Sequence, residues 1–279
     1  MTRKALCIGI NDYPGTDMDL AGCVNDAKDW AAELKNRGFA VTTLLDAQAT
    51  KAAMVAAIKG LIGGGVAGDS LVITYSGHGT YQPDTDGDEA DGLDEALCPY
   101  DIRIIGEALI DDEIHAMFSD CKPGVRLLLI ADSCHSGTVT RAAPSEPEVD
   151  APRPRFLPMG NWLPEAQLPR AYSGRTATHV VGAPPGASPF AGTLRKQEND
   201  LLLSGCKEGP NNYSYDARIG GRPNGAFSYY ALKTLKGLKA GATYADWHKA
   251  IAGYLPSSAY PQSPQIFGNA TACKQKVFA

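Results

Sequence analysis

Short unbroken apolar runs alternate with stretches of helical periodicity along most of the chain. The runs at 5–10, 39–45, 70–75 and 127–131 are typical of parallel strands buried on both faces. Strands that alternate with helices predict an α/β protein in which a mostly parallel central sheet has helices on both faces.

Apolar residues three and four positions apart predict the helices between these runs. The first is expected to begin near Asp17 or Asp19, the second covers 50–62, and the third covers 111–118. Each lies between two predicted strands, as the crossover connections of a parallel sheet require.

The alternation stops between 142 and 198, where ten prolines interrupt a stretch of little periodicity. We expect a long surface excursion here and not a second domain. Regular structure is predicted again as a strand over 200–206, helices over 226–235 and 244–254, and a closing edge strand over 276–278.

Composition narrows the classes of function. A formal net charge of −5 offers no basic surface for nucleic acid or an anionic membrane. The chain begins with a predicted strand, and no apolar run approaches membrane-spanning length, so we expect a cytoplasmic protein. The seven cysteines are scattered without a C-x-x-C pair, which favours free thiols over a disulfide framework or a zinc site.

Two of the apolar runs end in small polar clusters with one potentially reactive side chain each. His78 follows the run at 70–75, and Cys134 follows the run at 127–131. The carboxyl ends of parallel strands meet at one edge of a sheet, which predicts a cysteine–histidine dyad. His78 would take the proton of the thiol, and the backbone amides of Gly79 and Cys134 are the natural donors to an oxyanion. The alternative base is His135, whose ring should point elsewhere because it directly follows the nucleophile.

Four motifs resemble those of metacaspases, the caspase-like cysteine peptidases of plants, fungi, protists and bacteria, whose bacterial members are often called orthocaspases. In chain order they are GCVNDA at 22–27, SGHG at 76–79, DSCHSG at 132–137 and LSGCK at 203–207. The resemblance implies a cysteine endopeptidase that forms a thioester acyl-enzyme.

The resemblance also implies a caspase-like fold formed by a single peptidase domain over 1–279. Its expected parts are a large-subunit region at 1–141, a proline-rich linker at 142–198 and a small-subunit region at 199–279.

The specificity pocket follows from the same resemblance, which assigns its lining to Cys23, Asp26, Ser76 and Asp132. The acidic pair would select protein or peptide substrates with Arg or Lys before the scissile bond, because paired carboxylates bind a guanidinium well. The alternative is that neither residue forms a pocket: Asp26 only caps its helix or lies on its solvated face, and Asp132 only ends a strand.

An acidic loop at 84–95 is a candidate for calcium binding. It is not an EF-hand, because Glu89 stands where the sharp turn needs glycine. The resemblance instead assigns calcium ligands to Asp94, Asp111 and Asp112, with Arg141 in the region of a fourth acid. No cofactor is therefore expected to be required, calcium is a possible ligand, and a simply solvated acidic loop is the alternative.

Basic residues in the linker are candidate sites of self-processing, because exposed irregular segments are where proteases cut. Solubility alone also explains basic residues in a loop. The candidates are Arg141, Arg153, Arg155, Arg170, Arg175, Arg195 and Lys196.

Three other classes of protein are alternatives to a metacaspase-like peptidase. A caspase-like scaffold without turnover commonly lacks the dyad, which this chain retains. A nucleotide-binding α/β module would need a glycine-rich strand-to-helix turn, which is not found. A legumain-like or gingipain-like peptidase would be distinguished by its residue preference.

Overall fold

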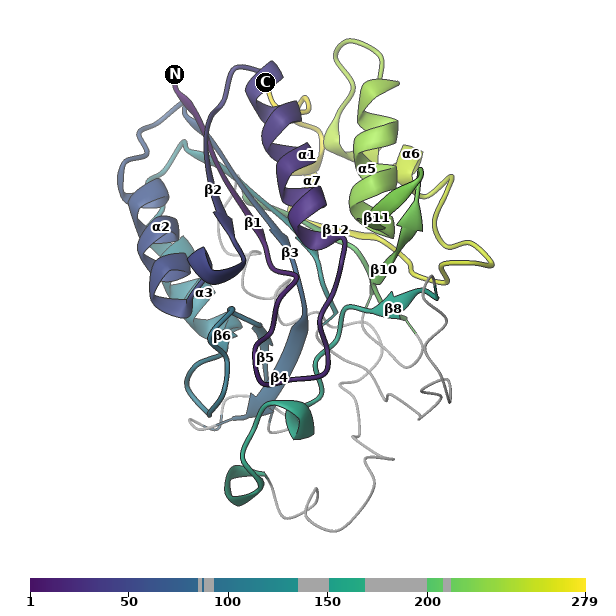
Figure 1. The fold of residues 1–279 in the computed structure, drawn as a ribbon. Helices are drawn as coiled ribbons and strands as arrows, with labels where there is room; N and C mark the ends of the chain where they lie inside the picture. The colour runs from purple at the N-terminus through teal and green to yellow at the C-terminus, as the bar shows by residue number, and fades with distance from the viewer. Residues whose placement is uncertain (85–86, 88–92, 135–150, 169–199, 208–211) are drawn as a thin grey trace.

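A six-stranded sheet forms the centre of the protein (Figure 1). The structure is a computed structural model that describes residues 1–84, 87, 93–134, 151–168, 200–207 and 212–279. The strands follow the order β12-β9-β7-β3-β1-β2, and every neighbouring pair is parallel except β12 with β9. The strands are β1 Arg3–Gly9, β2 Ala40–Leu45, β3 Ser70–Ser76, β7 Arg126–Asp132, β9 Asp200–Ser204 and β12 Gln265–Phe267.

Helices cover both faces of this sheet, as the sequence predicted (Figure 1). One face packs against α2 and α3, and the other against α1, α5, α6 and α7. No helix within the described ranges is long and apolar enough to cross a membrane. The helices are α1 Cys23–Asn36, α2 Lys51–Gly63, α3 Asp111–Ser119, α5 Ala226–Lys236, α6 Tyr244–Ile251 and α7 Ala270–Cys273.

The register of the central strands sets the position of the expected dyad. β3 and β7 are neighbours, and Ser76 at the end of one lies opposite Asp132 at the end of the other. His78 and Cys134 each follow two residues later, so both lie at the same edge of the sheet. The prediction that two strand ends bring these residues to one edge is confirmed.

Two small sheets flank this edge. The first has the order β4-β5-β6, and its antiparallel strands β4 and β5 enclose the acidic loop, so the described residues beside that loop form strands and not the helices of an EF-hand. The second has the order β11-β10-β8. The strands are β4 Gly79–Pro83, β5 Leu93–Leu97, β6 Leu109–Ile110, β8 Arg153–Pro154, β10 Tyr215–Ile219 and β11 Arg222–Gly225.

The expected start of the first helix was wrong. Helix α1 begins at Cys23, because the side chain of Asn11 accepts hydrogen bonds from the Cys23 and Val24 amides at 2.8 and 3.2 Å and caps the helix there. Asp19 instead accepts from the amide of Tyr13 at 2.8 Å in the preceding loop.

The expected edge strand over 276–278 was also wrong. The edge of the sheet is β12, whereas Phe278 packs its ring against Trp247 with the centroids 5.8 Å apart. The predicted helix over 244–254 is shorter than expected and ends at Ile251.

Close packing of α1 on β1 generates a prediction about stability. A Cβ on Gly9 would lie 2.4 Å from the Cys23 carbonyl oxygen and 2.7 Å from the Ala27 Cβ. Gly9→Ala should therefore lower the free energy of unfolding by about 1–3 kcal/mol, measured by denaturant titration. The control is Gly60→Ala in α2, where a Cβ meets nothing within 4 Å and the change should be neutral or stabilising. Equal effects of the two substitutions would contradict this account.

Candidate active site

His78 is completely buried and held in one tautomer. Its Nε2 lies 2.6 Å from the carbonyl oxygen of Met18, and because a carbonyl only accepts, Nε2 carries the proton and donates it. Nδ1 is then the unprotonated nitrogen, and it has no hydrogen-bond partner in the described parts of the chain. The ring is therefore oriented with a free base at Nδ1.

Cys134 is equally buried, and its thiol is not paired with His78. Sγ accepts a hydrogen bond from the amide of Ser214 and lies 3.6 Å from the Sγ of Cys206. Burial, and then Cys206, raise the pKa of the Cys134 thiol well above its usual range. Burial also lowers the pKa of His78 to about 4, so both members of the dyad are neutral in this conformation.

The predicted oxyanion donors are already occupied by the chain itself. The amides of Gly79 and Cys134 both donate to the carbonyl oxygen of Arg155, at 3.0 and 3.1 Å. The amide of Arg155 donates to the Ser214 carbonyl at 2.8 Å, and the amide of Leu157 donates to the Gly79 carbonyl at 2.9 Å. The carbonyl oxygen of Arg155 thus takes up both of the predicted oxyanion donors.

The side chain of Arg155 fills a closed acidic pocket. Its guanidinium is 0% exposed and forms ion pairs with Asp26 at 2.6 Å, Asp132 at 3.1 Å and Asp216 at 2.9 Å. Burial opposes its charge, but the carboxylates, Asp132 first, raise the pKa of Arg155 well above its usual range. Burial raises the pKa of Asp26 to about 7, against the lowering effect of Arg155. Three acids therefore share one cation in a site without water contact.

Backbone amides orient the carboxylates of the pocket. Asp132 accepts from the amide of Ser228 in the first turn of α5 at 2.9 Å. Asp216 accepts from the amide of Gly22, which precedes α1, at 3.0 Å, and Asp26 accepts from the amide of Gly225 at 3.0 Å. Gly225 is the N-cap of α5 and Gly22 the N-cap of α1, so backbone amides at two helix N-termini hold the three carboxylates in addition to Arg155.

Of the predicted pocket residues, Asp26 and Asp132 bind the guanidinium directly. Cys23 is fully buried, and burial raises the pKa of its thiol well above its usual range although Arg155 acts in the opposite direction. The hydroxyl of Ser76 lies 3.5 Å from that of Ser228, which places it beside the residue that holds Asp132.

The sequence analysis missed Asp216 and the role of Arg155. Asp216 stands on β10 outside the four motifs, and its neighbours Tyr215 and Ala217 are half-buried and buried, so no alternation along the strand marked it as a pocket residue. The expectation of a surface excursion was wrong for part of 151–168. Residues 152–153, 160–161 and 164–167 are exposed as expected, but the buried side chains are Arg155, Phe156, Leu157, Met159, Trp162 and Leu163.

The candidate calcium ligands lie at a different place, near the pairing of β5 with β6. Asp94 is on β5, and Asp111 and Asp112 form the first turn of α3 directly after β6. No group of three or more His, Cys, Asp or Glu residues that could hold a metal gathers within the described ranges. Arg141 and His135 lie outside those ranges, as does most of the acidic loop, so calcium binding stays a prediction.

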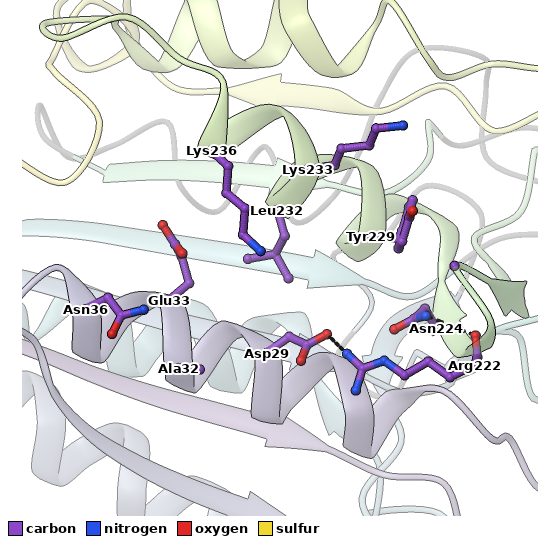
Figure 2. Close-up of a pocket in the computed structure, with 11 residues that line it drawn as sticks. Asp29, Ala32, Glu33, Asn36, Arg222, Asn224, Tyr229, Leu232, Lys233 and Lys236 are labelled. Atoms are coloured by element: carbon purple, nitrogen blue, oxygen red, sulfur yellow. Dashed lines mark hydrogen bonds and ion pairs between the residues drawn. The ribbon is translucent and has the colours of Figure 1, made fainter.

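A pocket of about 420 Å³ lies away from the dyad, between α1 and α5 (Figure 2). Glu33 on α1 and Lys236 on α5 extend into it from opposite sides, Arg222 pairs with Asp29 at one end, and the Lys233 side chain points away from α1. Its mixed charges are partly exposed and include neither member of the dyad. The space beside His78 and Cys134 is instead filled by Arg155 and its neighbours.

The parallel sheet and the histidine and cysteine at its edge define a protein of caspase-like fold. The sequence profile of the metacaspase peptidase C14 domain matches residues 3–143. Metacaspase-1A of Aspergillus terreus is 34% identical over 95% of this chain, and Metacaspase-1 of Mycosarcoma maydis is 35% identical over 95%. The chain belongs to the metacaspase family.

Other comparisons extend this result. Metacaspase-1A of Neurospora crassa is 32% identical over 95% of this chain, but the chain spans only 62% of that relative, and 70% of the Aspergillus terreus relative. These relatives are fungal, so they support the family and not specifically its bacterial branch. A crystal structure of a protein from Geobacter sulfurreducens matches with a TM-score of 0.73 and 33% identity, covering 100% of this chain and 99% of that one.

Occupation of the cleft generates a prediction about thiol reactivity. Removing one partner of a buried ion pair costs about 3–5 kcal/mol, so Arg155→Gln should displace the segment and speed alkylation of Cys134 by at least about tenfold. In the variant the rate should rise with pH as the hydrated thiol ionises near its ordinary pKa of about 8.5, whereas the wild-type rate should stay low.

The measurement is iodoacetamide labelling followed by peptide mass spectrometry, which separates Cys134 from the other cysteines. The control is Arg153→Gln, because the Arg153 side chain is exposed and, among the described residues, its hydrogen bond goes to the Asp19 carbonyl at 3.2 Å and to none of the three aspartates. Equal labelling of Cys134 in wild type and Arg155→Gln would contradict the occluded geometry.

Proposed function

We propose that the protein is a cysteine endopeptidase that cleaves peptide bonds after Arg or Lys through His78 and Cys134. The observation that carries this proposal is the position of Arg155. Its side chain lies among three carboxylates while its carbonyl oxygen accepts from the Gly79 and Cys134 amides. Membership of the metacaspase family supports the reaction class.

In the proposed reaction, His78 acts first as a base and then as an acid, and Cys134 supplies both the nucleophile and an oxyanion donor. His78 Nδ1 takes the proton of the Cys134 thiol, which must first leave the Ser214 amide, and the thiolate attacks the substrate carbonyl carbon. The amides of Gly79 and Cys134 stabilise the oxyanion. His78 then protonates the leaving amine, and water attacks the thioester that remains.

The charge of the pocket accounts for selection of a basic residue. Asp26, Asp132 and Asp216 carry more negative charge than one guanidinium neutralises, so an empty pocket favours a cation. A substrate Asp would face three carboxylates in a site of low dielectric constant and be rejected. Lys would bind as a point charge and lose the forked geometry that Arg provides.

The same geometry supports self-processing between Arg155 and Phe156. Of the basic linker residues that the structure describes, Arg153 is exposed on β8, whereas Arg155 lies in the pocket with its peptide carbonyl on the oxyanion donors. These contacts support Arg155–Phe156 as the bond that we propose is cleaved.

Asp216, the third acid of the pocket, and Asp132 generate a prediction about specificity. Asp216→Asn and Asp132→Ala should each lower kcat/KM for a peptidyl-arginine substrate by an amount equivalent to about 3–5 kcal/mol, because a buried cation loses its partner. Asp29→Asn is the matched control, since this partly exposed carboxylate on α1 pairs with Arg222 and with no other cation in the described parts of the chain. Unchanged turnover of the Asp132 variant, or preference for Asp peptides, would contradict the pocket assignment.

We propose that peptide hydrolysis does not need calcium, or that calcium binds only weakly. Asp94, Asp111 and Asp112 match three acids of the metacaspase calcium site, and Arg141 replaces the fourth with a positive charge. Hydrolysis of a peptidyl-arginine reporter should therefore appear after thorough chelation, or need millimolar calcium. Strict dependence that saturates at micromolar calcium would show that another acid completes the site.

A further inference from the structure

Both sides of the Arg155–Phe156 bond are anchored by separate sets of contacts. On the amino-terminal side, Arg155 is held by its three carboxylates, and Pro154 on β8 pairs with Tyr215 on β10. None of these contacts depends on the chain after the bond.

On the carboxyl-terminal side, the chain is anchored to β4. The Leu157 amide donates to the Gly79 carbonyl at 2.9 Å, and the Thr80 hydroxyl donates to the Leu157 carbonyl at 2.6 Å. The Trp162 indole donates to the Thr80 hydroxyl at 3.1 Å. The Phe156 ring stacks on Tyr81 with the centroids 5.5 Å apart.

Apolar burial makes this second anchor part of the core. Five side chains of the segment are at most 6% exposed and pack in the cluster that covers one face of the sheet: Phe156, Leu157, Met159, Trp162 and Leu163. Cleavage of one peptide bond removes none of these contacts. The new amino group of Phe156 would therefore stay beside the thioester and not diffuse away.

We propose that this amino group recaptures the acyl-enzyme, so that the protein forms the Arg155–Phe156 peptide bond as well as breaking it. The inference rests on the proposed function, since it needs the thioester between Cys134 and the Arg155 carbonyl carbon. The Phe156 amine attacks that carbon, the C–N bond forms, the C–S bond breaks, and the sulfur leaves as thiolate. His78 takes the proton that the amine loses and returns it to the thiolate.

Water and the Phe156 amine compete for the thioester, and the geometry favours the amine. A well-oriented intramolecular nucleophile acts at effective molarities of roughly 10⁵–10⁸ M. Water must enter a site in which His78, Cys134 and Arg155 are all 0% exposed. The segment therefore acts as a reversibly cleaved inhibitor in cis, and the intact chain is the main form until the segment is displaced.

Hydroxylamine tests this inference because it is a small nucleophile that traps thioesters as hydroxamates. The full-length wild-type protein is incubated with and without neutral hydroxylamine, and fragment masses are measured. We expect the fragment 156–279 to form at least tenfold faster with hydroxylamine, and the other fragment to end in an Arg155 hydroxamate. In buffer alone the chain should stay largely intact.

Three variants serve as controls. Cys134→Ala must give no Arg155 hydroxamate, which separates the enzymatic reaction from chemical splitting at Asn224–Gly225. Trp162→Phe keeps a ring but removes the donor to Thr80, so it should raise hydrolytic cleavage in buffer relative to wild type. Trp247→Phe removes a similar indole hydrogen bond, to the Ala231 carbonyl at 3.0 Å, far from His78 and Cys134. It should not raise hydrolytic cleavage.

Complete cleavage in buffer at a rate that hydroxylamine does not change would overturn the inference, as would a chain that stays intact in hydroxylamine. Failure of the proposed function gives a different result. In that case neither the wild type nor Arg155→Gln, whose cleft is open, would hydrolyse a peptidyl-arginine reporter.

Discussion

The buried guanidinium of Arg155 among three aspartates is the interaction on which the described site depends. It neutralises charges that come from α1, β7 and β10, three elements far apart in the sequence. A buried ion pair of this kind contributes little net stability, because desolvation offsets the attraction, but removal of one partner is costly. The carboxylates are held by backbone amides in addition to Arg155, which is the arrangement expected of a binding pocket that the chain itself occupies.

Occupation of the pocket also explains the state of the dyad. The segment that delivers Arg155 excludes water from His78 and Cys134, and burial keeps both uncharged. In the function we propose, specificity and inhibition therefore come from the same contacts. A substrate with a basic residue would compete with Arg155 for the three aspartates before the thiol could be hydrated and activated.

Sequence patterns predicted the parts of this arrangement that depend on local order. Apolar runs located β3 and β7, and their parallel pairing followed from the alternation with helices, so His78 and Cys134 could be placed at one edge. The N-cap of α2 at Thr50 was likewise predictable. Contacts between segments far apart in the sequence could not be predicted from such patterns. The start of α1 depends on Asn11, and the burial of Arg155 depends on a fit between a proline-rich segment and a pocket that forms only when the chain is folded.

The central claim is that the pocket selects a basic residue before the scissile bond. Its most direct test is mass spectrometry of the products formed from a diverse peptide library by the full chain, with Cys134→Ala as the blank. The account predicts that Arg or Lys precedes almost every cut and that Asp precedes none. Cuts without a basic residue on their amino-terminal side, at comparable rates, would contradict it.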